Sequence, residues 1–442
     1  MTDPINLLKK CFNDLVGHAS AASALDGAMP CPPAAAGRTY LLAIGKAAAA
    51  MAQEFERQWP ADAPLSGIAL TRYSHGASCQ RVEVIEASHP VPDTVGLETA
   101  QRVVDQVSRL GPHDLLVCLI SGGGSALLSL PVPAVSAPEK RSVNRQLLAS
   151  GLPIDQMNCL RKHLSAVKGG RLAELAHPAR VHTIAISDVP GNDLSTIASG
   201  PTVPDLTTRQ QALDIARALP DTPASVLDWL NQPQAETPSG SAAFDADTAL
   251  VTVTPETAFA ALVSDLSSQH PDMDVHFLGA DLEGDAKELG QQHAELAKDL
   301  KASTNGRPQL ILSGGETTVT LPAGSSAGKG GRNAEYLLAF TCALAGEQGI
   351  YALAADTDAI DGSEDNAGAW VSPSDWQRAQ DLIPAHDWQR AQDLGLDPDL
   401  DPMAYLSGHD SYSWFQEMGL LLKTGPTLTN VNDFRAILVL PD

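Results

Sequence analysis

Short apolar runs alternate with longer segments of helical periodicity along most of the chain. The runs are bounded by turn residues and predict buried strands at 39–44, 67–71, 82–86, 115–120, 181–186, 249–252, 275–278, 310–312, 351–355, 420–423 and 436–440. The segments between them predict helices at 4–25, 47–59, 94–110, 136–149, 154–175, 207–219, 224–230, 256–269, 284–302, 333–345 and 411–418. Strands that alternate with helices predict an α/β protein.

One segment interrupts this alternation. Residues 231–241, with the sequence NQPQAETPSGS, combine Pro, Gly and polar residues in the manner of a linker. The strand–helix pattern starts again after them. We therefore expect two α/β domains, at 1–240 and 241–442, with the active site in the cleft between them.

Composition narrows the class of protein. The 442 residues are 43% hydrophobic, and 29 basic residues face 53 acidic ones, which gives a net charge of −24. That charge argues against nucleic acid or an anionic membrane as a partner, since both need a basic surface. The six cysteines form no C-x-x-C pair, and the chain shows neither a signal-peptide pattern nor an apolar run of transmembrane length. We expect a soluble, cytoplasmic protein with reduced thiols.

The two halves share a glycine-containing stretch. Residues 114–131 (DLLVCLISGGGSALLSLP) and 308–322 (PQLILSGGETTVTLP) both place Ser-Gly-Gly directly after a predicted strand. Ligands of open α/β sheets bind at the carboxyl ends of strands, and glycine lets the backbone approach them. The first stretch predicts an anion-binding loop formed by Ser121, Gly122, Gly123, Gly124 and Ser125. A tight strand–helix turn is the alternative.

This loop matches neither common nucleotide motif. A G-x-G-x-x-G fingerprint that starts at Gly122 would need glycine where Leu127 stands. The Walker A pattern fails here, and it also fails at 324–331, where Gly330 replaces the Ser or Thr that follows the lysine.

Basic residues supply further candidates in the first half. Lys46 follows strand 39–44 and Gly45, a position from which lysine can contact phosphate; a surface lysine at a helix start is the alternative. A cationic group also lies on the predicted helix 154–175, and it consists of Arg161, Lys162, Lys168 and Arg171. Helical spacing predicts that residues 161, 164, 168 and 171 share one face. In an acidic chain this group favours an anionic ligand over a solvated helix face.

Acidic residues follow other predicted strands. Asp188, Asn192 and Asp193 come after strand 181–186, where carboxylates suit Mg²⁺ binding or general-base work, with an Asx turn as the alternative. In the second half, an acidic loop begins at Asp356, and Glu316, Lys329 and Arg332 form a mixed-charge set. The loop departs from EF-hand spacing and can also be a solvated turn. For the lone histidines His89 and His409 we expect structural roles.

Several longer motifs, taken in order, resemble the glycerate 2-kinase family. They are SGGGSALLSLP, LRKHLSAVKGGRLAEL, ISDVPGNDLSTIASGPTVPD, LSGGETTVTL, GKGGRNAEYLLAF, AADTDAIDG and TGPTLTNVNDFRAILV. The resemblance extends from about residue 7 to 440. It implies a Rossmann-like, three-layer N-terminal domain and a C-terminal α/β domain that contains a MOFRL region at about 308–440.

The activity implied by the resemblance is ATP-dependent phosphorylation of D-glycerate on its 2-hydroxyl, which gives 2-phosphoglycerate and ADP. Family proteins have also been named hydroxypyruvate reductases, but the missing dinucleotide fingerprint counts against that activity. An NAD(P)H-dependent reductase and a non-catalytic sugar-acid-binding protein stay as alternatives. A monomer and a homodimer are both compatible with the sequence.

Site roles follow from the resemblance and from the candidates above. The family's functional lysine matches Lys46, and its functional arginine, in the GGRN segment, matches Arg332; we expect both to neutralise the transferred phosphoryl group and the glycerate carboxylate. The remaining assignments are residues 121–125, Lys168 and Glu316 for ATP, Asp188 for Mg²⁺ or as the base, and Asn192, Asp356 and Asp410 for the substrate.

Two features depart from the family pattern. His409 stands where the pattern usually has Asn. The octapeptide DWQRAQDL occurs at 375–382 and again at 387–394, and we expect it to lengthen a surface segment without chemistry of its own.

Overall fold

The computed structural model describes residues 3–34, 36–240, 242–303, 306–321, 328–381 and 400–441. They form two compact units. The N-terminal unit comprises Ser20–Thr254 with Leu428–Asn430, and the C-terminal unit comprises Met1–Ala19, Pro255–Thr427 and Val431–Asp442.

This division differs in two respects from the boundary expected at 240/241. The strand after the predicted linker, β6 (Thr248–Val253), pairs with the first sheet, so the units divide near residue 254. The first helix also belongs to the C-terminal unit. The helix expected at 4–25 is two helices, α1 (Pro4–His18) and α2 (Ala21–Leu25), and the division falls between them.

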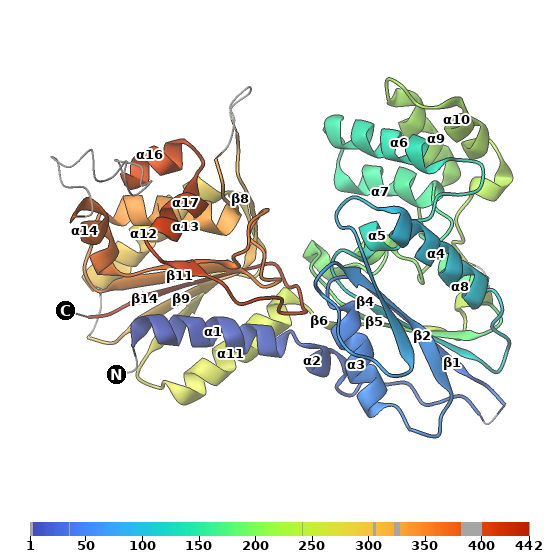
Figure 1. Ribbon diagram of the computed structural model, residues 1–442, viewed down its shortest axis with the longest axis horizontal. Coiled ribbons are helices and arrows are strands. Elements are labelled where there is room, and N and C mark those ends of the chain that lie inside the picture. Colours follow the sequence, from blue (N-terminus) through green and yellow to red (C-terminus); the bar gives the residue numbers. More distant parts are fainter. Residues whose placement is uncertain are drawn as a thin grey trace. The chain divides into compact units, whose positions relative to one another are not determined.

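The N-terminal unit is built on a six-stranded parallel sheet in the order β3-β2-β1-β4-β5-β6 (Figure 1). Its other strands are β1 (Thr39–Ile44), β2 (Leu65–Arg72), β3 (Val82–Ala87), β4 (Leu115–Ile120) and β5 (Arg180–Ile186). Every residue of β1 and β4 is buried, as expected for central strands of a parallel sheet covered on both faces. The Rossmann-like architecture predicted for this part of the chain is confirmed.

Helices cover both faces of this sheet. α2 and α3 (Ala48–Gln58) pack on one face, and α4 (Thr94–Val107) and α8 (Arg171–Ala176) pack on the other. Four further helices share a separate apolar core and lie together in Figure 1: α6 (Ala137–Ala149), α7 (Ile154–His163), α9 (Arg209–Ala218) and α10 (Ala224–Leu230). The short helix α5 (Gly124–Leu127) and the 3-10 turns η1 (Pro190–Asn192), η2 (Ile197–Ser199), η3 (Pro233–Ala235) and η4 (Ala242–Phe244) complete the unit.

The helix predicted at 154–175 is wrong as a single element. α7 ends at His163, and α8 begins at Arg171. Gly169 and Gly170 between them have φ of +58° and +78°, and their N–H groups donate to the carbonyls of Ser199 and Gly200 at 3.0 and 2.7 Å. The two glycines tolerate the left-handed conformation, and a neighbouring loop accepts their N–H groups, so the chain is not helical directly before α8.

The C-terminal unit has a mixed sheet in the order β13-β12-β11-β14-β9-β7, in which only the β7–β9 pair is parallel. Its strands are β7 (Asp274–Phe277), β9 (Gln309–Ser313), β11 (Ile350–Asp356), β12 (Gly368–Val371), β13 (Leu421–Leu422) and β14 (Asp433–Val439). A second, two-stranded sheet pairs β8 (Leu282–Asp285) with β10 (Gly315–Thr318).

Two helix layers enclose the mixed sheet (Figure 1). α1 and α11 (Pro255–Gln269) lie on one face, and α12 (Ala286–Ser303) and α13 (Arg332–Leu344) lie on the other. The main core forms where α12 and α13 pack on the strands. The remaining helices are α14 (Pro373–Asp381), α16 (Pro402–Ser407) and α17 (Ser411–Glu417). Within the described ranges, no helix combines the length and the apolar character needed to cross a membrane.

The repeated octapeptide is only partly described. Its first copy lies largely in α14. The second copy, at 387–394, falls outside the described residues.

Candidate functional site

Strands β1 and β4 define the candidate site of the N-terminal unit. They lie side by side in parallel, and Ile44 aligns with Ile120 at their carboxyl ends. The strand order reverses direction between these two strands. Because ligands of open α/β sheets bind at such a reversal, beyond the carboxyl ends of the strands, the two loops that follow β1 and β4 are the first place to expect one.

These two loops are tied to each other. The backbone N–H of Lys46 donates to the Gly122 carbonyl at 2.8 Å, and the Ser121 hydroxyl accepts from the N–H of Ala47 at 3.0 Å. A side chain at Gly45 would place its Cβ 2.3 Å from the Ser121 hydroxyl oxygen, so only glycine permits this approach. Ser121 is buried, and its hydroxyl therefore joins the two loops.

Residues 121–125, which we call the glycine loop, present two backbone donors. The N–H groups of Gly122 and Gly123 donate to no acceptor among the residues that the structure describes. Gly123 has a left-handed backbone, with φ of +82°. Successive N–H groups in such a turn form a concavity that binds anions, and a buried N–H without a partner is costly. This geometry supports the predicted anion-binding loop.

Side chains from four segments surround Gly122 and Gly123. A Cβ built on Gly122 would lie 2.1 Å from Oδ2 of Asp188 and 2.6 Å from Nδ2 of Asn430. A Cβ on Gly123 would lie 3.0 Å from Nε2 of His89 and 3.5 Å from Cγ of Lys46. The structure therefore brings Lys46, Asp188 and the glycine loop together, as their positions after β1, β5 and β4 predicted.

Asn430 orients Asp188, since its Nδ2 donates to Oδ2 of Asp188 at 2.8 Å. Asn430 carried no predicted role, and we expected only a structural role for His89. Asn430 comes from a segment far away in the chain, and no local pattern indicated that it would meet β5. The available signal was its presence in the TGPTLTNVNDF motif.

Lys168 lies at the other end of the glycine loop. Its Nζ donates to the carbonyl and to the hydroxyl of Ser125, both at 2.5 Å, and that hydroxyl also contacts the Ser199 hydroxyl at 2.8 Å. Lys168 is buried, and burial, followed by the charges of Lys140 and Arg161, lowers the pKa of its ammonium well below the ordinary value. Lys168 thus meets the loop with which it was predicted to act.

The rest of the predicted cationic group behaves differently. Because the chain leaves the helix at His163, helical spacing does not place these residues on one face, and that part of the prediction is wrong. Lys162 pairs with the buried Asp205 at 3.2 Å. Arg171 donates to the carbonyls of residues 234, 235 and 236 at 3.0 to 3.3 Å.

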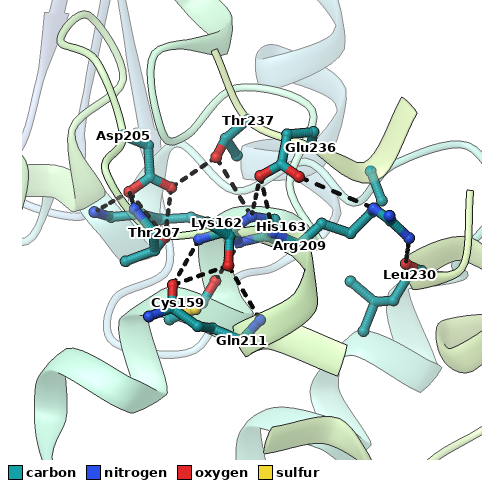
Figure 2. Close-up of polar contacts among 12 residues, drawn as sticks. Cys159, Lys162, His163, Asp205, Thr207, Arg209, Gln211, Leu230, Glu236 and Thr237 are labelled. Carbon is teal, nitrogen blue, oxygen red and sulfur yellow. Dashed lines mark hydrogen bonds and ion pairs between the residues drawn. The ribbon is translucent and has the colours of Figure 1, made fainter. Parts of the chain in front are cut away.

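Figure 2 shows the polar contacts around Lys162. Asp205 also accepts from the hydroxyls of Thr207 and Thr237, each at 2.9 Å. His163 is fully buried, its Nε2 lies 3.8 Å from the Glu236 carboxylate, and burial lowers its pKa. Because the polar side chains around Lys162 bind one another, we assign them a structural role in the N-terminal unit.

In the C-terminal unit, Arg332 is the centre of an ion-pair network. Its Nε donates to Asp433 at 2.8 Å, its Nη1 to Glu316 at 2.7 Å and its Nη2 to Asp356 at 2.8 Å. Burial alone would lower the pKa of the guanidinium, but the carboxylates of Asp433 and Asp356 outweigh burial and raise it. The predicted Glu316, Arg332 and Asp356 therefore meet, and the unpredicted Asp433 joins them.

The start of α13 is fixed by an acidic loop. Asp361 accepts from the N–H groups of Asn333 and Ala334 at 2.9 and 2.8 Å, which caps the helix that carries Arg332. Burial raises the pKa of Asp361 to about 6 despite these two bonds. Part of the acidic loop is thus a buried helix cap.

Asp410 holds the segment that precedes Arg332. Its carboxylate accepts from the N–H of Lys329 at 2.8 Å and from the Ser413 hydroxyl at 2.7 Å. The neighbouring His409 contacts the buried Glu335 at 2.9 Å, and burial raises the pKa of that carboxyl. Asp410 and His409 thus contact residues near the two ends of the 328–335 segment. Substrate binding by Asp410 and by Asn192 stays a prediction.

A magnesium ion would have limited protein ligands here. Among the residues that the structure describes, no three His, Cys, Asp or Glu side chains are grouped to hold a metal ion. Magnesium needs fewer, because it keeps several waters and often binds through one or two carboxylates and substrate phosphates. Asp188, beside the glycine loop, fits that need.

Two family models and several relatives match this chain. Residues 7–231 match a family described as a domain of unknown function, DUF4147, and residues 309–433 match the MOFRL family. The D-glycerate 2-kinase of Thermotoga maritima is 34% identical over 90% of this chain and 89% of its own. A protein of Agrobacterium vitis, named provisionally as a hydroxypyruvate reductase, is 45% identical over 98% of this chain and 94% of its own.

Solved structures agree with this result. The crystal structure of glycerate kinase from Thermotoga maritima matches with a TM-score of 0.83 at 32% identity and covers 99% of this chain and 100% of that chain. A crystal structure of a Pyrococcus horikoshii protein matches with a TM-score of 0.76 at 29% identity, over 100% of both chains. Family, identity and fold lead to the same conclusion: the chain belongs to the glycerate 2-kinase family, with a DUF4147 region followed by a MOFRL region.

Proposed function

We propose that this protein is an ATP-dependent kinase that phosphorylates D-glycerate on its 2-hydroxyl and releases 2-phosphoglycerate and ADP. The observation that carries the proposal is the glycine loop. Two backbone N–H groups that have no acceptor among the described residues lie beside a strand-end lysine and a strand-end aspartate, at the point where the strand order reverses. Family membership and the names of the kinase relatives support it.

Phosphoryl transfer depends on positioning and on neutralisation of charge, with little covalent chemistry for the protein to perform. In our proposal the N–H groups of Gly122 and Gly123 hold phosphate oxygens of ATP, and Lys168 fixes the loop through Ser125. Lys46 then neutralises charge on the transferred phosphoryl group. The Asp188 carboxylate, oriented by Asn430, accepts the proton of the 2-hydroxyl. Magnesium, when bound, would neutralise phosphate charge, and Asp188 could hold it as the alternative to its role as the base.

Arg332 needs a change of partner to act on an anionic substrate. The ion-pair network around Arg332 contains two arginines, because Arg435 also pairs with Asp433. It contains three carboxylates, so the network carries no excess of positive charge. Glu316 is the exposed carboxylate of the three, with a side chain 56% exposed. We propose that the substrate carboxylate replaces Glu316 on the guanidinium, while Asp356 and Asp433 keep Arg332 in place.

One coupled assay tests the function. Purified protein is incubated with ATP, Mg²⁺ and D-glycerate, and product is followed through enolase without phosphoglycerate mutase. Glycerate-dependent ADP release with a signal that needs no mutase supports the 2-kinase. A signal that requires the mutase means that the product is 3-phosphoglycerate, which contradicts the assigned position.

The reductase activity is the second candidate because of the name of the Agrobacterium vitis relative. Its assay is NADH or NADPH oxidation with hydroxypyruvate in the same preparation. Oxidation without any ADP release would replace the kinase proposal by the reductase. Absence of both activities would favour a non-catalytic binding protein.

A further inference from the structure

Three cationic side chains of the N-terminal unit form a cluster that the proposed mechanism uses only in part. Lys140 on α6 and Lys168 before α8 expose only 6% and 4% of their surface, and Arg161 on α7 is half-buried. We call Lys140, Arg161 and Lys168 the buried cation cluster. Sequence analysis assigned no role to Lys140, which stands in an ordinary polar helix sequence.

Two adjacent chain segments bring Lys140 and Lys168 together, and Arg161 lies near enough for its charge to act on Lys168. An antiparallel bridge joins Pro131 to Ser165, and the N–H of Ala166 donates to the Leu130 carbonyl at 3.0 Å. At one end of this pairing, Nζ of Lys140 lies 3.4 Å from the Leu130 carbonyl. At the other end, Nζ of Lys168 reaches Ser125 of the glycine loop.

No carboxylate neutralises the cluster within the described part of the chain. Lys140 contacts only the Leu130 carbonyl, Arg161 contacts only the Asn158 amide oxygen at 3.3 Å, and Lys168 contacts only Ser125. Two other buried cations have a carboxylate partner: Lys162 pairs with Asp205, and Arg435 pairs with Asp433. Acidic side chains are abundant in this chain, so their absence from this place is a local property of the fold.

Buried cations without counter-ions are unfavourable. Burial lowers the pKa of Lys140 to about 7, and the charges of Lys140 and Arg161 add to burial in lowering the pKa of Lys168. The charged forms of these side chains are therefore destabilised both by burial and by repulsion from one another. A bound anion would offset both the desolvation and the repulsion. Strongly perturbed charged groups of this kind are found mostly at functional sites.

We propose that Lys140, Arg161 and Lys168 form an anion subsite that continues the glycine loop beyond Ser125 and takes a phosphate group of the nucleotide. The inference rests on the proposed function for the identity of the ligand. Three cations suit a polyphosphate better than the single charge of a hydroxy acid, although both are oxyanions that the same side chains could bind. The subsite makes Lys140 and Arg161 binding residues that contact the nucleotide away from the transferred phosphoryl group.

The test measures binding of inorganic tripolyphosphate to the full chain by isothermal titration calorimetry at pH 7, without magnesium or glycerate. We expect Lys140→Met to weaken binding about 10- to 100-fold, the range for loss of one hydrogen bond to a charged group. Lys140→Arg should retain most of the affinity, because it restores the charge. Arg141→Met, which removes an exposed cation from the same helix, is the matched control and should bind as the wild type does.

The outcomes separate this inference from the kinase proposal. Equal tripolyphosphate affinity for wild type and folded Lys140→Met overturns the subsite, and if that variant does not fold, the same comparison is made with Arg161→Met. An unchanged KM for ATP with a raised KM for glycerate overturns the nucleotide assignment in favour of the hydroxy acid. If tripolyphosphate binds in a Lys140-dependent way but no ADP is formed by the wild type, the subsite stands and the kinase proposal fails.

Discussion

Replacement of Arg332 by alanine tests whether the arginine serves the fold, the reaction or both. The change removes the hydrogen bonds to Asp433, Asp356 and Glu316 at once. Asp433 keeps Arg435 and the Asn333 amide as partners. Asp356 is buried and loses the Arg332 guanidinium but keeps the N–H of Asp358, which donates to it at 3.0 Å, and Glu316 returns to solvent.

These environments set the size of the effect. The exposed Glu316 contact contributes on the order of 0–1 kcal/mol, as surface ion pairs do. Removal of one partner from a buried pair costs about 3–5 kcal/mol, because it leaves a buried charge uncompensated. Since Asp433 keeps two partners and Asp356 keeps the N–H of Asp358, we expect a loss at or near the lower end, about 3 kcal/mol, for Arg332→Ala. Arg332→Lys should lose less, because it keeps the charge, but a point charge cannot bind three carboxylates in one plane.

The assay combines urea denaturation with turnover at saturating ATP and glycerate. Trp414, which is fully buried in the C-terminal unit, reports its unfolding through fluorescence. We expect Arg332→Lys to remain folded and to lose at least about 100-fold in turnover, since the charge-assisted contact from Nη1 of the guanidinium to the substrate carboxylate is lost. Glu316→Gln is the control for the network and should stay within about 1 kcal/mol of the wild type. An Arg332→Ala protein as stable as the wild type would refute the structural argument, and near-normal turnover of Arg332→Lys would refute the catalytic one.

Further predictions concern the N-terminal unit. Lys46→Ala should lower turnover by several orders of magnitude while the thermal unfolding temperature stays unchanged; normal turnover would remove Lys46 from the site. Gly122→Ala should abolish ATP binding measured by calorimetry, because its methyl group would lie 2.1 Å from the Asp188 carboxylate, and unchanged affinity would show that the loop adapts. Burial depresses the pKa of Lys140 from 10.5 to about 7, so the unfolded chain holds that proton up to a higher pH than the folded protein, and stability should rise between pH 7 and 10.5. Lys140→Met should therefore raise the unfolding free energy at pH 7 by about 1–3 kcal/mol and should weaken its increase with pH. Lys162→Met removes the ion-pair partner of the buried Asp205 and should lower the unfolding free energy. A change of the same sign for both variants would contradict the assignment of the two lysines.

The sequence predicted the parts of the site that follow from strand position. Lys46, the glycine loop and Asp188 each come directly after a buried apolar run, and parallel strands bring their carboxyl ends to one edge. A local pattern was sufficient for these residues because the parallel sheet brings the ends of its strands together. In the same way, Arg332 and Glu316 could be grouped from a glycine-rich segment and a strand end.

Contacts between distant segments could not be predicted in this way. Asn430 meets Asp188 across 242 positions of the chain, and Asp433 meets Arg332 across 101. The prediction for the cationic group failed for a related reason: α7 ends at His163, and the N–H of Gly169 donates to the Ser199 carbonyl of another loop, so the helical spacing used to place the group does not exist. Lys140 carried no signal at all, because burial of a lysine depends on which helices pack around it.

The strand order by itself would favour a dinucleotide enzyme, so the choice between kinase and reductase depends on the loop after β1. A dinucleotide fingerprint places its second glycine where the backbone must approach the pyrophosphate. Here Gly45 is followed by Lys46 and Ala47, so the second glycine is absent, and Ala47 is buried with its N–H bonded to Ser121. The backbone donors that remain available belong to the glycine loop after β4, and Lys46 faces that loop. The anion contact is therefore expected after β4, with Lys46 beside it, and not after β1. This arrangement suits a phosphoryl group held between two loops better than a pyrophosphate lying along one helix. That physical difference supports the kinase even though relatives of high identity bear the other name.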